Sequence, residues 1–209
     1  MKNAKIEQLV LGMVSTNVWL IKNKETGEIL IVDPADRPGQ IQRRIQQMEG
    51  KPVAILLTHG HFDHIMAATE LRRIYQIPVY AHEFEKAVLT DSRYNLSGSW
   101  AKAYTMEADQ WVKDNEILEL AGFEIQVMHT PGHTPGGCCY YIEEESILIS
   151  GDTLFAESVG RTDFPGSSGQ KMWESLHRLL RELPEDTGVY PGHGEETTIG
   201  HEKRYNPFA

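Results

Sequence analysis

The segment that most constrains this chain places four side chains of metal-binding type within six positions, 59–64. It reads HGHFDH and is separated from the apolar run 53–57 by one residue, Thr58. A bare apolar run of five is typical of a buried strand, and loops at the ends of such strands carry the active sites of α/β sheets. Imidazole and carboxylate groups at this density suit zinc, iron or manganese. The segment therefore predicts a metal site at the end of a buried strand.

Three later segments each display one further ligand type in a glycine-containing turn. His133 lies in HTPGHTPGG, Asp152 in SGDTLF and His193 in YPGHG. Glycine lets the backbone approach a site closely. Taken singly, each segment is typical of an ordinary turn. Their recurrence after the first cluster predicts that the three side chains join the same site.

Hydrophobic periodicity gives a coarse order of elements along the chain. The pattern predicts strands over 5–11, 14–21, 28–32, 53–57, 79–80, 123–128, 138–142, 147–149 and 188–190, and helices over 41–48, 65–75 and 173–183. Asp36 is the expected N-cap of the first helix, and Gly50 its expected stop. Residues 84–111 match no single pattern. A length of 209 residues predicts one domain spanning 1–209.

Composition excludes several classes of function. The formal charge of −10 opposes binding to nucleic acid, and no apolar stretch approaches the roughly 20 residues of a membrane span. The opening segment lacks the apolar core of a secretory signal, so a cytoplasmic location is expected. The two cysteines, Cys138 and Cys139, are adjacent on a predicted strand and point to opposite faces, which predicts packing roles and no disulfide.

With these motifs in view, the chain resembles the metallo-β-lactamase fold superfamily, which shows HxHxDH followed by a His, an Asp and a His. The resemblance extends from VDP at 32–34 to the tail TIGHEKRYNPF. It is strongest to the hydroxyacylglutathione hydrolase (glyoxalase II) branch, in particular to short relatives that carry GRTDFPG and lack the C-terminal helical domain. The resemblance implies an α/β fold, a four-layer αββα sandwich with metals at one edge of its two sheets.

The resemblance also implies a role for each motif residue. One metal would be held by His59, His61 and His133, the other by Asp63, His64 and His193, and Asp152 would bridge both. The expected cofactors are two divalent metal ions, zinc foremost, with iron and manganese as alternatives. Asp33 is open to two interpretations, a turn role, which the sequence favours, or an acceptor that orients a ligand histidine. The other histidines, His82, His129, His177 and His201, match no ligand role.

The implied activity is a metal-dependent hydrolase that cleaves a thioester such as S-lactoylglutathione by a metal-activated hydroxide. Asp63 and Asp152 would be its catalytic carboxylates, and a small-molecule acyl thioester its partner. Arg161 stands where those enzymes place a basic glutathione contact, which predicts an anion clamp, although a plain surface salt bridge fits equally. Asp163 replaces their binding tyrosine, and this departure argues against glutathione specificity.

Other functions share parts of this pattern. A mononuclear-iron persulfide dioxygenase would use His59, His133 and Asp152 and also shows GRTDF, but its last motif typically resembles PAHDY where this chain reads PGHG. A non-catalytic metal-binding module predicts closed coordination. Nucleases of the superfamily conflict with the acidic charge, and the GDTLF and GRTDFPG segments favour the hydrolase branch over a β-lactamase. The oligomeric state is left open.

Overall fold

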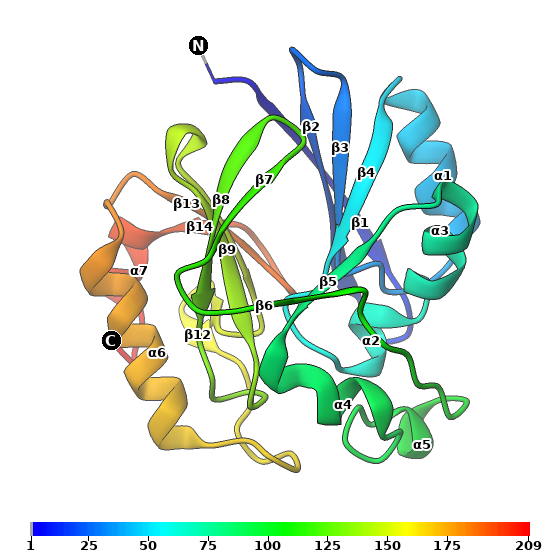
Figure 1. Ribbon diagram of the computed structural model, residues 1–209. Helices are drawn as coiled ribbons and strands as arrows, with labels where there is room; N and C mark the ends of the chain where they lie inside the picture. Colours follow the sequence, from blue (N-terminus) through cyan, green and yellow to red (C-terminus); the bar gives the residue numbers. More distant parts are fainter. Residues whose placement is uncertain (1) are drawn as a thin grey trace.

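Two six-stranded sheets form the centre of the structure, a computed structural model that describes residues 2–209 (Figure 1). The first sheet has the order β1 (Ala4–Leu11), β2 (Thr16–Asn23), β3 (Glu28–Val32), β4 (Lys51–Leu56), β5 (Val79–His82) and β6 (Gln110–Val112). The second has the order β14 (Thr197–Thr198), β13 (Gly188–Pro191), β10 (Ile147–Gly151), β9 (Cys138–Ile142), β8 (Phe123–His129) and β7 (Ile117–Leu120). Pairing is parallel from β3 to β6 and between β10 and β13, so these strands end at the same edge of their sheets.

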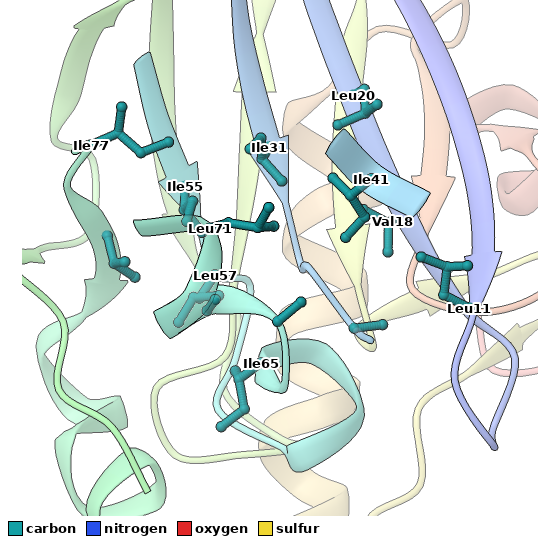
Figure 2. Close-up of a cluster of buried hydrophobic side chains, with 14 of the residues drawn as sticks. Leu11, Val18, Leu20, Ile31, Ile41, Ile55, Leu57, Ile65, Leu71 and Ile77 are labelled. Carbon is teal, nitrogen blue, oxygen red and sulfur yellow. The ribbon is translucent and has the colours of Figure 1, made fainter. Parts of the chain in front are cut away.

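The first sheet is buried on both faces, which explains its nearly continuous apolar strands. Because side chains alternate along a strand, Val18 and Leu20 of β2 point outward to the helices, while Trp19 and Ile21 point to the second sheet. Helices α1 (Pro38–Gln47) and α3 (Ala68–Tyr75) cover the outer face. Figure 2 shows Ile41 of α1 and Leu71 of α3 among the outward-facing side chains of this sheet.

The second sheet repeats this arrangement on the other side of the molecule. Tyr140 of β9 packs between the sheets, whereas Tyr141 packs with Leu176 and Leu179 of α6 (Gly169–Glu182). The adjacent Cys138 and Cys139 divide between the same two cores, and both are free and buried, as predicted. The order helix, sheet, sheet, helix confirms the predicted αββα sandwich.

Three local predictions need correction or completion. Helix α1 begins after Arg37, which has a left-handed backbone and no capping side chain, so Asp36 is not its N-cap; the Asp36 carboxylate instead accepts a hydrogen bond from the Arg37 amide. The helix predicted over 65–75 begins only at Ala68, as α3, and the residues before it form a separate short helix, α2 (Phe62–Ile65). The unassigned stretch forms η1 (Glu83–Glu85), α4 (Lys86–Thr90), α5 (Ser97–Trp100) and β6.

The remaining elements are short. They are η2 (Glu143–Glu145), the separate ribbon of β11 (Leu154–Phe155) and β12 (Ser158–Val159), and α7 (Ile199–Tyr205) beside α6. In residues 2–209, no helix has both the length and the apolar character that crossing a membrane requires.

Candidate metal centre

The seven predicted ligand side chains meet at the edge where β4, β8, β10 and β13 end. His59 and His61 follow β4, Asp63 and His64 lie on α2, and His133, Asp152 and His193 follow β8, β10 and β13. The first four therefore come from the first sheet and the last three from the second. The site is built across the gap between the sheets.

The side chains form two groups with one carboxylate between them. Ligand atoms of His59, His61 and His133 lie within 4.8 Å of one another, and so do those of Asp63, His64 and His193. Asp152 contacts both groups, with Oδ2 3.3 Å from Nε2 of His133 and Oδ1 3.5 Å from Nε2 of His64. This position between the groups suits a carboxylate that bridges two cations.

The donor chemistry of the site fits a metal. Nε2 of His59, His61 and His64 and Oδ1 of Asp152 are buried without a hydrogen-bond partner. A buried polar atom without a partner lowers the stability of the fold by about 1–3 kcal/mol. Four such atoms at one place therefore indicate that they share a ligand. A divalent cation can accept lone pairs from imidazole and carboxylate together, as zinc, iron and manganese do.

The Asp33 carboxylate holds His64 in orientation. Its Oδ2 lies 2.9 Å from Nδ1 of His64, and the same carboxylate accepts hydrogen bonds from the amide and hydroxyl of Thr58, at 2.8 and 2.6 Å. A proton on Nδ1 leaves Nε2 of His64 as the free lone pair facing Asp63 and Asp152. The Asp33 side chain thus orients a ligand histidine, and it does not take the turn role that the sequence favoured.

Charges within the cluster set the protonation of its histidines. Burial lowers the pKa of His59 and of His61 well below the ordinary value, and neighbouring imidazoles add to this effect. Burial also acts to lower the pKa of His64, but the carboxylates of Asp63, Asp152 and Asp33 outweigh it and raise that pKa well above normal. The three carboxylates therefore make the His64 side of the cluster favourable for positive charge, which a cation bound at Nε2 would supply.

A cavity of about 410 Å³ opens onto these groups. His61, Asp63, His133, Asp152 and His193 line its floor. Arg161 lies at its rim, where the guanidinium pairs with the Asp163 carboxylate at 2.8 Å and covers the Phe164 ring at 4.5 Å. Both charged side chains are exposed, so the surface salt bridge expected as one alternative for Arg161 is present.

Comparison with known proteins agrees with this geometry. The family model of the metallo-β-lactamase superfamily matches residues 11–193. The chain belongs to this superfamily. Among curated relatives, it is 37% identical to the probable metallo-hydrolase YqgX of Bacillus subtilis, over 98% of this chain and 97% of that protein. It is 35% identical to the hydroxyacylglutathione hydrolase GloC of Haemophilus influenzae, over 97% of each chain.

Two solved structures extend the likeness to the fold of the superfamily. BLEG-1, a B3 metallo-β-lactamase, matches with a TM-score of 0.92 and 39% identity, over 98% of this chain and 99% of that chain. TTHA1623, solved in a di-iron-bound form, matches with a TM-score of 0.86 and 35% identity, over 97% of this chain and 100% of that chain. The resemblance predicted from the motifs is thereby confirmed.

In this superfamily member, a buried carboxylate missed by the sequence analysis braces two ligand loops. Glu85 is fully buried, and its two oxygens accept hydrogen bonds from the amides of Gly60 and Gly136, each at 2.8 Å. Burial raises the pKa of Glu85, and the hydrogen bonds act against that shift. Glu85 thus joins the loop of His59 and His61 to the loop of His133.

One glycine of the superfamily motif YPGHG permits close contact at the centre of the site. A Cβ on Gly192 would lie 2.2 Å from Oδ1 of Asp152 and 2.8 Å from Cε1 of His64. Both distances are far below van der Waals contact. The motif therefore needs glycine here because Asp152 and His64 occupy the space of a side chain.

The four histidines without a predicted ligand role lie outside both ligand groups, as far as residues 2–209 show. His82 and His129 stack on each other with ring centroids 4.1 Å apart and a 7° angle between the planes. His177 contacts Trp173, and His201 pairs with Glu157 at 2.9 Å. These contacts give all four a role in packing or surface pairing.

Proposed function

We propose that this member of the metallo-β-lactamase superfamily is a metal-dependent hydrolase that cleaves carboxylic thioesters. The observation that carries the proposal is the pair of ligand groups joined by Asp152 at the floor of an open cavity. A structural metal site would be closed, whereas a catalytic one keeps room for substrate. The relatives described as metallo-hydrolase and hydroxyacylglutathione hydrolase support the same class of reaction.

The residues present would hold two cations. His59, His61 and His133 would bind one, Asp63, His64 and His193 the other, and Asp152 would contact both. When bound, such a pair polarises a carbonyl oxygen and lowers the pKa of a bound water to about 7. Zinc is the cation we propose first, with iron and manganese as alternatives.

We assign to Asp63 the role of orienting the attacking water. Its Oδ2 accepts a hydrogen bond from the Thr16 hydroxyl at 2.7 Å and lies 3.3 Å from Nε2 of His193, so the carboxylate is fixed at the cavity floor. A carboxylate held in this way accepts a hydrogen bond from the nucleophile and directs its lone pair at the acyl carbon. Asp63 and Asp152 are the carboxylates that we assign to catalysis.

The leaving group explains why a thioester suits the site. In the described part of the chain, the titratable groups lining the cavity are predicted ligands and Arg161, so no spare carboxylic acid is available there as a proton donor. A thiol of pKa about 8.5 leaves as thiolate with little help from an acid. An amine or alkoxide leaving group would need that help.

A second candidate function is hydrolysis of β-lactams. The specific observation is the 39% identity and TM-score of 0.92 to BLEG-1, described as a B3 metallo-β-lactamase. The same attack of water on a carbonyl carbon would open a β-lactam ring. The two activities therefore have to be separated by assay.

The proposal is tested by assaying zinc-loaded and iron-loaded protein without oxygen, against S-lactoylglutathione, a neutral thioester and a chromogenic cephalosporin. We expect thioester turnover that Asp152→Asn abolishes. Turnover of the cephalosporin alone would favour the second candidate. Failure of every thioester with either metal, together with consumption of a persulfide by the iron form in a parallel assay with oxygen, would replace the hydrolase with the dioxygenase.

A further inference from the structure

The walls of the cavity are apolar almost throughout. Besides Phe62 of α2, the lining above the ligand floor includes six large apolar side chains: Met13, Val14, Leu96, Trp100, Phe155 and Phe164. They come from segments far apart in the sequence, the turn between β1 and β2, helix α5 and its preceding turn, and the segment after β10. A bound molecule would therefore meet apolar surface on several sides.

This apolar surface begins at the ligands themselves. The Phe164 ring meets the rings of His61 and His133 edge-on, with centroids 5.5 and 5.9 Å apart. Phe155 meets His193 in the same way at 6.0 Å. A group attached to the reacting carbonyl would thus lie against aromatic carbon as soon as it left the ligand cluster.

The outer part of the wall is exposed to water. The exposed fraction is 70% for Met13 and 62% for Trp100. Covering such side chains yields about 25 cal/mol per Å² of apolar area. Exposed apolar side chains gathered at the mouth of a cavity mark a surface that a ligand covers.

Among the described residues, the rim of the cavity offers no unpaired cationic side chain to an anionic substrate. Arg161 is the one cationic side chain in the described lining, and Asp163 accepts hydrogen bonds from its Nε and its terminal nitrogen, at 3.0 and 2.8 Å. A substrate carboxylate would have to displace Asp163 from this pair. The chain as a whole carries a formal charge of −10, which repels anions further.

We propose that the site selects thioesters with a bulky apolar acyl group and an uncharged thiol part over anionic thioesters such as those of glutathione. This inference rests on the proposed function. In the reaction, the oxygen of water bonds to the acyl carbon, the carbon–sulfur bond breaks, and its electron pair leaves with sulfur. The leaving thiolate takes up one proton of the water to become a thiol, and the carboxylic acid formed releases the other as it ionises. No oxidant or reductant takes part.

The test compares the acetyl, butanoyl and hexanoyl thioesters of N-acetylcysteamine with S-lactoylglutathione on the zinc-loaded protein. Burial of one methylene is worth about 0.8 kcal/mol, so we expect kcat/KM to rise about fourfold per methylene. The hexanoyl ester is expected to exceed S-lactoylglutathione. A flat series, or a preference for S-lactoylglutathione, would overturn the inference while leaving thioester hydrolysis in place.

Two variants and a matched control locate the effect. Trp100→Ala and Met13→Ala remove exposed wall side chains, so they are expected to flatten the dependence on acyl length while zinc content and folding stay unchanged. Trp173→Ala removes a tryptophan that is 57% exposed on α6 and does not line this cavity, and it is expected to keep the full dependence. Equal slopes in Trp100→Ala and Trp173→Ala would contradict the proposed wall.

Binding of thioethers, which the protein cannot hydrolyse, tests this inference independently of the proposed hydrolase activity. The S-hexyl and S-methyl thioethers of N-acetylcysteamine and S-hexylglutathione cannot be hydrolysed, so calorimetry reports their affinity whether or not any thioester turns over. We expect S-hexyl-N-acetylcysteamine to bind more tightly than the other two, with the difference reduced in Trp100→Ala. If no thioester is cleaved but this order holds, the hydrolase proposal fails and the preference of the cavity stands. The reverse order would overturn the preference.

Discussion

At the scale of single residues, the position of the Glu85 carboxylate leads to a prediction that the motifs alone do not give. Glu85→Gln keeps one acceptor oxygen but turns an amide donor toward the N–H of Gly60 or Gly136, so one brace is lost. Loss of such an outer partner typically lowers metal affinity about 10- to 100-fold. Competition with a zinc chelator measures this change.

The exposed neighbour Glu83 provides the control, since Glu83→Gln leaves both hydrogen bonds in place. We expect zinc affinity in this variant to equal that of the wild type. Equal affinity in Glu85→Gln, with its fold intact, would show that Glu85 does not position the ligand loops.

Gly192 gives a second prediction at this scale. In Gly192→Ala, the methyl group would clash with Asp152 and His64, so one of them must move away. We expect loss of metal from the site and loss of activity, measured by metal analysis and by thioester assay. Gly39→Ala serves as the comparison, because no atom lies within 4 Å of its added Cβ and alanine favours helix α1. A fully metal-loaded Gly192→Ala protein would refute the argument from close contact.

The sequence reveals the residues that carry ligand atoms more clearly than those that orient them: it leaves two roles open for Asp33 and does not mark Glu85 at all. Seven ligand positions stand in recognisable motifs at strand ends. Asp33 and Glu85 each act on a loop that lies 25 or more positions away, on Thr58 and Gly60 respectively, and no local pattern marks such a contact. Only the packing of β3 beside β4, and of η1 beside the loops, brings these carboxylates into place.

At the scale of elements, the rings of His82 on β5 and His129 on β8 stack on each other and so join the two sheets. This contact makes the stability of the fold depend on pH. Burial lowers the pKa of His82 to about 4, with His129 adding to the shift and Asp114 opposing it. The unfolded chain takes up this proton near pH 6.5, whereas the folded protein does so only near pH 4. The pKa is depressed on folding, so stability is lost as pH falls through this window.

His82→Asn tests this coupling, because the amide oxygen can replace Nδ1 as acceptor for the Phe84 amide but cannot titrate. Denaturant unfolding at fixed metal content should show the stability advantage of the wild type over the variant shrinking by about 1–2 kcal/mol between pH 7 and pH 5. A constant difference across that range would assign the proton uptake to other groups.

Periodicity predicted the long elements and failed for residues 84–111. Strands such as β8 and helix α6 show clear alternation or helical spacing over seven or more residues. Residues 84–111 fold into elements of three to five residues, too short to repeat any period. The split between α2 and α3 has a similar origin, since two ligands of the HGHFDH motif occupy the first helix.

At the scale of the whole molecule, apolar runs indicate that strands are buried but not which sheet they join. The run 53–57 and the strand 138–142 have similar character, yet β4 and β9 lie in opposite sheets. The sandwich was predicted by resemblance, because the order of strands within each sheet depends on long-range pairing. The same pairing explains why the ligands, spread over 135 positions from His59 to His193, come together.

Because the ligands come from both sheets, bound cations would tie the sheets together at one edge, and their removal should loosen the whole sandwich. A ligand that binds only the folded state adds about 2.7 kcal/mol of stability at a concentration 100 times its Kd, and about 4.1 at 1,000 times. For a chain of this size that corresponds to roughly 5–15 °C in Tm.

We expect chelation to lower Tm of the zinc-loaded protein by this amount, and to lower it less in Asp152→Asn, which lacks the bridging carboxylate. Hydrogen exchange should then rise together in the loops after β4 and after β8, because each loses its attachment to the other. An unchanged Tm after verified metal removal would mean that hydrophobic packing alone keeps the two sheets together at this edge, without a contribution from the cations.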